Sequence, residues 1–153
     1  QIQKRIASRE YLAVVHGVPD GDSGTIVGAI GRHPVDRKKY AVVSGDNGRH
    51  ACTHWSLEER LGDYSLLRFK LDTGRTHQIR VHCAHMNHPV VGDPTYSRCR
   101  KLPIDLPGQA LHAFQLGLDH PINRERMVFE APMPPVMEKL LGVLRRRNAS
   151  GQC

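Results

Sequence analysis

Residues 64–71 carry the pattern that most constrains how this chain can fold. Leu67, Phe69 and Leu71 alternate with Arg68 and Lys70, as a strand with one buried face requires. Short stretches of similar character recur along the chain between turn residues. We expect strands at residues 11–15, 40–43, 51–57, 64–71, 114–118 and 127–131. Short turns between strands favour antiparallel pairing.

Three connections between these strands have the composition of turns. Residues 21–24 predict a turn after the first strand, and a basic loop follows it. Residues 45–48 read Gly-Asp-Asn-Gly, and their Gly and Asn residues accept the positive φ of a hairpin turn between the strands at 40–43 and 51–57. Residues 120–124 are predicted to join the last two strands.

Helical periodicity appears first after Gly74. Ile79, Cys83 and Met86 recur at helical spacing and predict a helix over residues 76–85. Asn87 follows this helix, and asparagine tolerates the left-handed conformation that often ends helices.

A second apolar stripe of period 3.6 runs from Val136 to Leu144, launched by two prolines, and predicts a C-terminal helix. The fold class is therefore α+β: a mainly antiparallel mixed sheet with flanking helices. We expect one domain over residues 1–147 and a disordered tail at residues 148–153.

The charge of the chain suggests a polyanionic partner. Lys and Arg number 22 against 15 Asp and Glu, which gives a net charge of +7. A basic excess of this kind fits nucleic acid, although a merely basic protein would show it too. No stretch approaches the roughly 20 apolar residues of a membrane span. The cysteines are widely spaced and predict neither a disulfide framework nor a cysteine zinc site.

Two motifs identify a family resemblance. Residues 71–82 read L-D-T-G-R-T-H-Q-I-R-V-H, and residues 88–96 read H-P-V-V-G-D-P-T-Y. This pattern resembles the signature of RluA-type pseudouridine synthases. Residues 11–17 are similar to the tyrosine-bearing strand of that family. Two departures are Tyr40, where an aliphatic residue or Met is expected, and Asn87, where glycine is usual.

The resemblance implies an RNA-modifying isomerase that needs no cofactor and no metal. In this family the N-glycosidic bond of a uridine breaks, the uracil turns, and a carbon–carbon bond rejoins it to the ribose. The nucleophile is an aspartate in the motif H-R-L-D-x-x-T-S-G, which this sequence does not contain. We therefore expect a pseudouridine synthase catalytic core that lacks its N-terminal portion, begins downstream of the catalytic aspartate and is inactive alone.

Two residues match catalytic positions of the family. Tyr11 matches the active-site tyrosine, which stacks on the flipped uracil. Arg80 matches the arginine that orients the catalytic carboxylate and keeps it ionised. Asp72 belongs to the arginine motif and is not expected to be the nucleophile. Without the resemblance, a strand tyrosine and a solvated helix arginine would be the simpler readings of Tyr11 and Arg80.

Basic and polar residues in two segments are candidates for RNA contact, because cations within a short span can grip phosphate groups. They are Arg32, His33, Arg37, Lys38, Lys39, Arg75, Thr76 and His77. The alternative for the charged run is a solvated surface. We expect structured ribosomal or transfer RNA as partner, no membrane, no obligate protein partner and a cytoplasmic location.

Two other functions compete with the enzyme. A catalytically inactive RNA-binding module derived from this family would keep the basic surface without the nucleophile. A metal-binding protein would use the cluster of His77, His82, His85 and His88, but three-residue spacing spreads these side chains around a helix. Absence of the N-terminal strands would also leave sheet edges and apolar surface bare, which predicts a self-associating or marginally stable chain.

Overall fold

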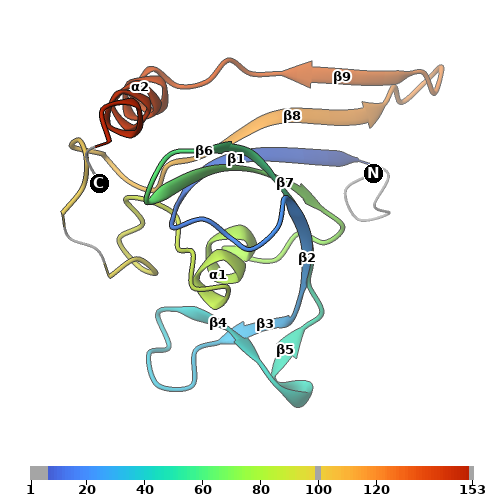
Figure 1. The fold of residues 1–153 in the computed structure, drawn as a ribbon. Helices are drawn as coiled ribbons and strands as arrows, with labels where there is room; N and C mark the ends of the chain where they lie inside the picture. Colours follow the sequence, from blue (N-terminus) through green and yellow to red (C-terminus); the bar gives the residue numbers. More distant parts are fainter. Residues whose placement is uncertain (1–6, 99–100, 152–153) are drawn as a thin grey trace.

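The computed structural model describes residues 7–98 and 101–151 and is built on a six-stranded sheet (Figure 1). The order across the sheet is β2-β6-β7-β1-β8-β9. Every pairing in it is antiparallel among the described residues. The strands are β1 (Ser8–His16), β2 (Ser23–Val27), β6 (Cys52–Arg60), β7 (Tyr64–Leu71), β8 (Leu111–Asp119) and β9 (Arg126–Glu130). The α+β fold with a mainly antiparallel sheet is confirmed.

A smaller three-stranded sheet, in the order β4-β3-β5, lies apart from the large one. It contains β3 (Ala29–Arg32), β4 (Tyr40–Val43) and β5 (Gly48–Arg49). The hairpin predicted between the strands at 40–43 and 51–57 is wrong. β4 pairs with β3, while β6 joins the large sheet. Residues 45–47 form a 3-10 turn, η1 (Gly45–Asn47), in which Gly45 alone takes positive φ.

Two helices lie on opposite sides of the large sheet. α1 (Gln78–His85) packs on one face, where Ile79 and Cys83 join Val15 and Phe69 in a core cluster. α2 (Pro135–Ala149) packs on the other face through Leu140 and its neighbours. The far side of α1 contacts the small sheet, since Val81 clusters with Ile30 and Ala51. Figure 1 shows α1 held between the two sheets.

The alternation of β7 is confirmed. Leu67 and Phe69 are fully buried on the α1 face, and Leu71 packs against the same cluster. Arg68 binds Glu58 and Glu10. Leu66, on the opposite face, is buried in the α2 cluster. The alternation therefore identifies the face of β7 that packs on α1.

Several predicted bounds shift. α1 begins at Gln78 rather than at residue 76, because His77 takes a left-handed φ of 56° that no α-helix can include. Asn87 has a φ of 65°, as its place after the helix predicted. β2 and β3 cover residues for which only a turn and a loop were expected.

The C-terminal helix is longer than predicted. α2 continues through Asn148 to Ala149, and Ser150 caps it. These residues belong to the range expected to be a disordered tail. The last two positions of that range, 152 and 153, lie outside the described residues.

The edge strand β9 exposes apolar side chains. Phe129 is 49% exposed and Val128 is 55% exposed. Leu116 of β8 lies directly opposite Phe129 and is 36% exposed. In the part of the chain that the structure describes, no helix is long and apolar enough to cross a bilayer.

Candidate active site

Arg80 of α1 and Asp93 of the following loop form a buried ion pair. Nε of Arg80 donates to Oδ2 at 2.7 Å, and Nη2 donates to Oδ1 at 2.9 Å. The two side chains are 11% and 0% exposed. The hydrogen bonds to Asp93 raise the pKa of Arg80 against the opposing effect of burial. Two parallel bonds fix the plane of the guanidinium as well as its position.

Asp93 is held ionised by several donors. Burial acts to raise its pKa, but hydrogen bonds from Arg80 and from the backbone N–H groups of Tyr96 and Thr95 outweigh it, so that the pKa is lowered. Of the guanidinium nitrogens of Arg80, Nη1 alone makes no hydrogen bond to a described residue. Nη1 can therefore donate to a second carboxylate.

Aromatic side chains surround this ion pair. The Arg80 guanidinium lies 5.0 Å from the ring centroid of Tyr96. The Tyr96 hydroxyl accepts a hydrogen bond from the backbone N–H of Tyr40 at 3.1 Å and contacts His77 Nδ1 at 2.9 Å. Burial, and then the charge of Arg80, lower the pKa of His77, which favours the neutral ring. Tyr96 can then donate to Nδ1, and its rigid ring supports the guanidinium.

A hollow of about 1080 Å³ opens beside these residues. Its wall combines the β3–β4 loop, β4, the outer side of α1 and the loop that follows α1. Asp93 and Tyr96 line it together with His33 and Lys39. The hollow therefore joins two segments that are distant in sequence: the predicted basic loop and the H-P-V-V-G-D-P-T-Y motif.

Tyr11 lies on the sheet face that α1 covers. It pairs with Phe69 of β7 and with Ala113 of β8. Its half-buried side chain packs against the cluster that contains Ile79 of α1. Tyr11 and Arg80 thus approach the same side of the sheet from a strand and from a helix. In residues 7–98 and 101–151 no hydrogen bond, ion pair or ring contact joins the two side chains, and Tyr11 does not line the hollow.

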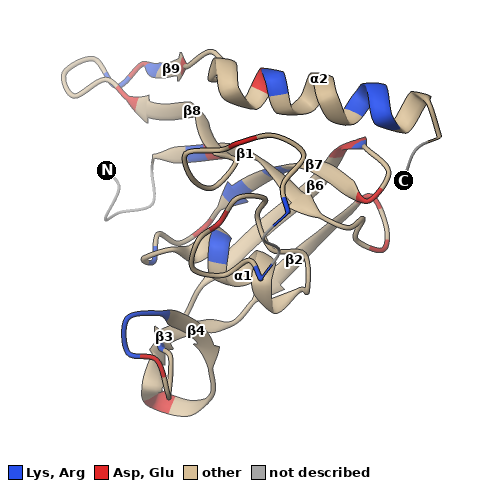
Figure 2. Cartoon of the chain, turned by 90° about the vertical axis from the view of Figure 1, so that its left-hand side faces the viewer, with Lys and Arg blue, Asp and Glu red and all other residues tan. Residues whose placement is uncertain are grey.

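The basic loop runs from Arg32, the last residue of β3, to the start of β4, at the end of the molecule opposite α2 (Figure 2). It contains His33, Arg37, Lys38 and Lys39. The Arg32 guanidinium stacks 4.6 Å from the centroid of Tyr40 and donates to the Arg37 carbonyl. Lys39 pairs with Asp36 at 3.5 Å. Arg37 and Lys38 are exposed, and within the described residues they make no ion pair.

Gln78 holds together the turn that leads into α1, and it was not among the site residues predicted from the sequence. Its Oε1 accepts from the Thr73 hydroxyl and from the backbone N–H of Arg75. Its Nε2 donates to the Cys52 carbonyl and to the Thr53 hydroxyl. Gln78 is 3% exposed. The sequence did offer one indication of a buried polar role for Gln78, namely a glutamine beside the apolar Ile79 at the start of a predicted helix.

The other predicted residues of this turn have different surroundings. Arg75 donates from Nε to the His50 carbonyl at 2.9 Å, so its guanidinium supports the loop before β6. Thr76 is exposed. His77 belongs to the aromatic group beside Arg80.

The histidine cluster considered for metal binding is divided among separate partners. His77 contacts Tyr96, His82 contacts Thr53 and Gly28, His88 contacts the His16 carbonyl, and His85 is exposed. The spread expected for three-residue spacing is observed, and each buried ring is explained by a hydrogen bond.

The chain belongs to the RNA pseudouridylate synthase family, as an RluA-type member. The family model for RNA pseudouridylate synthase matches residues 1–85. An uncharacterized RNA pseudouridine synthase of Synechocystis sp. is 49% identical over 148 residues, which cover 96% of this chain and 45% of the relative. The ribosomal large subunit pseudouridine synthase D of Pseudomonas aeruginosa is 46% identical over 95% of this chain and 48% of its own length.

Solved structures agree with this assignment. Human RNA pseudouridylate synthase domain containing 1 matches with a TM-score of 0.71 and 28% identity, over 94% of this chain and 67% of that one. Human RNA pseudouridylate synthase domain containing 4 has the same fold, with a TM-score of 0.74 and 24% identity over 94% of this chain and 64% of that one. The chain spans about half the length of the curated relatives that it matches.

Proposed function

We propose that the protein containing this chain isomerises uridine to pseudouridine in structured ribosomal RNA. The observation that carries the proposal is the Arg80 guanidinium, which is clamped by Asp93 along one edge while Nη1 remains available. Family membership supplies the reaction class, and the names of the ribosomal large subunit relatives support ribosomal RNA over transfer RNA. A ribosomal substrate would place the protein in the cytoplasm.

The reaction is an isomerisation, so uridine and pseudouridine have the same composition. The N1–C1′ bond breaks, a C5–C1′ bond forms, the proton on C5 leaves to solvent, and N1 takes up a proton in its place. A carboxylate nucleophile must hold one fragment during the turn. The family motif that bears this carboxylate does not occur in the 153 residues. We propose that the aspartate comes from another part of the full-length protein.

Arg80 is suited to receive that aspartate. Its guanidinium is nearly buried, stays charged, and is held in one plane by Asp93 and Tyr96. A carboxylate bound at Nη1 would be oriented and kept ionised. Tyr11 would supply a ring for the flipped uracil from the adjacent sheet face. The neutral His77 would leave Arg80 as the cation that determines the charge of this part of the site.

The hollow and the basic loop form the proposed RNA surface. Base flipping costs a few kcal/mol of stacking, which phosphate contacts must offset. Arg37 and Lys38 are exposed and have no ion-pair partner among the described residues. Lys39 and His33 reach the wall of the hollow itself. This surface could bind the RNA backbone while the target nucleotide enters the site.

The test uses the full-length protein and an unmodified large-subunit ribosomal RNA transcript. Pseudouridine is measured by release of tritium from uridine labelled at C5, and RNA binding is measured separately. We expect Arg80→Lys to lower the rate by about 10²-fold or more, because an ammonium cannot keep the planar two-bond contact with Asp93 and also hold a further donor in a fixed direction. Tyr11→Ala should also lower it, because it removes the ring that would stack on the uracil. Arg60→Lys, at an exposed ion pair with Asp22, is the matched control.

Two outcomes would contradict this proposal. If the full-length protein binds RNA but forms no pseudouridine in any transcript, the inactive RNA-binding module is correct. If Arg80→Lys and Arg60→Lys have the same rate as the wild type, Arg80 does not act in the reaction.

A further inference from the structure

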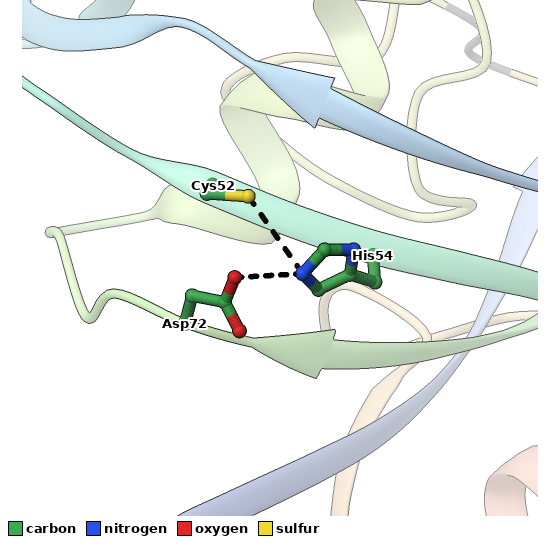
Figure 3. A group of neighbouring side chains, drawn as sticks. All are labelled: Cys52, His54 and Asp72. Carbon is green, nitrogen blue, oxygen red and sulfur yellow. Dashed lines mark hydrogen bonds and ion pairs between the residues drawn. The ribbon is translucent and has the colours of Figure 1, made fainter.

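Three potential metal ligands converge beside β6, away from the candidate active site. Cys52 and His54 are two residues apart on β6, so their side chains point to the same face of the sheet. Asp72 directly follows β7, the neighbouring strand, and its backbone N–H approaches the Cys52 carbonyl at 3.3 Å. Figure 3 shows the thiol, the imidazole and the carboxylate pointing toward one another.

The sulfur of Cys52 and a carboxylate oxygen of Asp72 both approach the same nitrogen of His54. His54 Nε2 lies 2.7 Å from Asp72 Oδ2 and 3.8 Å from Cys52 Sγ. One candidate ligand atom from each residue lies within 4.8 Å of the other two. Because the thiol and the carboxylate share Nε2, the group cannot work as a nucleophile, base and orienting acid, which requires contacts at both ring nitrogens.

The second ring nitrogen has its own partner. His54 Nδ1 lies 2.9 Å from the Thr25 hydroxyl, on the adjacent strand β2. In the metal-free form Nε2–H donates to Asp72 and Nδ1 accepts from the Thr25 hydroxyl. In a metal-bound form the hydrogen would sit on Nδ1 and be donated to Thr25, which would leave the lone pair of Nε2 for the metal. Metal-binding histidines are usually oriented in this way by an outer hydrogen bond.

We propose that Cys52, His54 and Asp72 bind a divalent zinc-like transition metal, with Cys52 Sγ, His54 Nε2 and one Asp72 carboxylate oxygen as ligands. Thiolate and imidazole favour zinc and cobalt over magnesium and calcium, which take oxygen ligands. Metal bonds of about 2.0–2.3 Å at tetrahedral angles separate the ligand atoms by about 3.2–3.5 Å. The present separations of 2.7 and 3.8 Å need to change only modestly.

The protonation states are consistent with metal uptake. Burial and then Asp72 raise the pKa of the Cys52 thiol, which keeps the metal-free thiol protonated at neutral pH. The hydrogen bond from His54 lowers the pKa of Asp72, so its carboxylate is already ionised. A metal must displace the thiol proton, and binding should therefore release protons and strengthen as the pH rises.

Such a metal would be structural. The Cys52 backbone N–H donates to Thr73, and the Cys52 carbonyl accepts from Gln78. The ion would therefore fasten the end of β7 to β6 just before the turn that leads to α1. None of its three ligands lines the hollow beside Arg80. With three protein ligands, the fourth position would be filled by water.

The experiment titrates the chain with Zn²⁺ and Co²⁺ in a Cys99→Ser/Cys153→Ser background, in which Cys83 is the other cysteine and is fully buried. We expect one ion per chain, a cobalt spectrum with thiolate charge-transfer bands, proton release, and a Tm that rises with zinc concentration. Cys52→Ser, His54→Gln and Asp72→Asn should each weaken zinc binding about tenfold or more. Circular dichroism verifies that each variant folds.

The matched control is His120→Gln, in the exposed β8–β9 turn, which should bind zinc as the parent does. Absence of stoichiometric binding would overturn the proposal. So would a cobalt spectrum without thiolate bands, or a zinc affinity in Cys52→Ser equal to that of the parent. Because Asp72 is an exposed side chain, Asp72→Asn tests the site even if Cys52→Ser fails to fold.

Discussion

Arg80 and Asp93, which lie 13 residues apart, meet through two parallel hydrogen bonds at 2.7 and 2.9 Å. Arg80 belongs to α1, and Asp93 belongs to the loop that follows α1. This pair links the two sequence motifs of the family into one site. It also determines which edge of the guanidinium is left for other groups.

Replacing the Asp93 carboxylate by an uncharged amide should lower the stability of the fold. Asp93→Asn leaves a buried guanidinium without its counter-charge and is expected to lower the free energy of unfolding by about 3–5 kcal/mol at neutral pH. Urea denaturation measures the change. Asp22→Asn breaks an exposed pair with Arg60 and should cost less than about 1 kcal/mol. Equal effects of the two substitutions would show that burial does not matter here.

Acidification should destabilise the fold through buried His82. Burial lowers the pKa of His82 below its ordinary value of 6.5. The unfolded chain therefore takes up a proton first, so stability is complete above about pH 6.5 and falls as the pH drops toward the lower folded pKa. His82 can change the free energy of unfolding by at most about 1.4 kcal/mol per pH unit.

A substitution isolates that contribution. In His82→Gln the amide can still bond to Thr53 and to the Gly28 carbonyl, which His82 contacts at 2.9 and 3.3 Å. Urea midpoints measured between pH 7.5 and 5.5 should then decline less steeply than in the wild type. His16 and His77, whose pKa values are also lowered by burial, act in the same direction. His50→Gln, at an exposed position, is the substitution for comparison. If the urea midpoint of His82→Gln declines with pH as steeply as that of the wild type, His82 is not the cause of the acid sensitivity.

Replacing the amide of Gln78 by a carboxylate should lower the stability of the fold. In Gln78→Glu the group that donates to the Cys52 carbonyl and to the Thr53 hydroxyl becomes an acceptor. Leaving a buried acceptor unpaired costs about 1–3 kcal/mol, and a buried charge adds to this. A lowered urea midpoint is therefore expected. Gln109→Glu, at an exposed position, should leave the midpoint nearly unchanged.

The basic loop should contribute affinity without sequence specificity. Arg37→Ala/Lys38→Ala removes two exposed charges and is expected to weaken binding to all RNAs alike. The slope of log K against log salt should become less steep by about 1.4 on a single strand. Titrations at several salt concentrations measure both effects. Arg146→Ala/Arg147→Ala, on α2 at the other end of the molecule (Figure 2), should change the binding much less.

The exposed edge at β9 should promote self-association. Phe129 and Leu116 form an apolar cross-strand pair beside an edge strand, which is a template for further pairing. We expect the chain to associate with rising concentration and Phe129→Lys to reduce this, as measured by light scattering after gel filtration. Val35→Lys, in a loop where Val35 is 87% exposed, is the control. A monomeric wild type at high concentration would contradict the prediction.

The sequence alone predicted the elements whose signals are local. The alternation in β7 identified its buried face, the hairpin at residues 120–124 joins β8 to β9 as expected, and Asn87 takes the left-handed conformation after α1. The succession of short strands with two helices predicted the fold class, and the family resemblance pointed to Tyr11 and Arg80. Each of these depends on residues within a few positions of one another.

The tertiary structure decided which distant residues meet. Gly45 makes a turn, but β4 pairs with β3 and not with β6, because the strand that becomes a partner is decided by how the whole sheet packs and not by the turn residues alone. The His54–Asp72 contact depends on the pairing of β6 with β7, and the bonds of Gln78 to Cys52 and Thr53 depend on α1 packing beside β6. Local sequence sets backbone conformation and the face that a side chain takes. Partners across the sheet are set by burial of the whole core, which no single segment encodes.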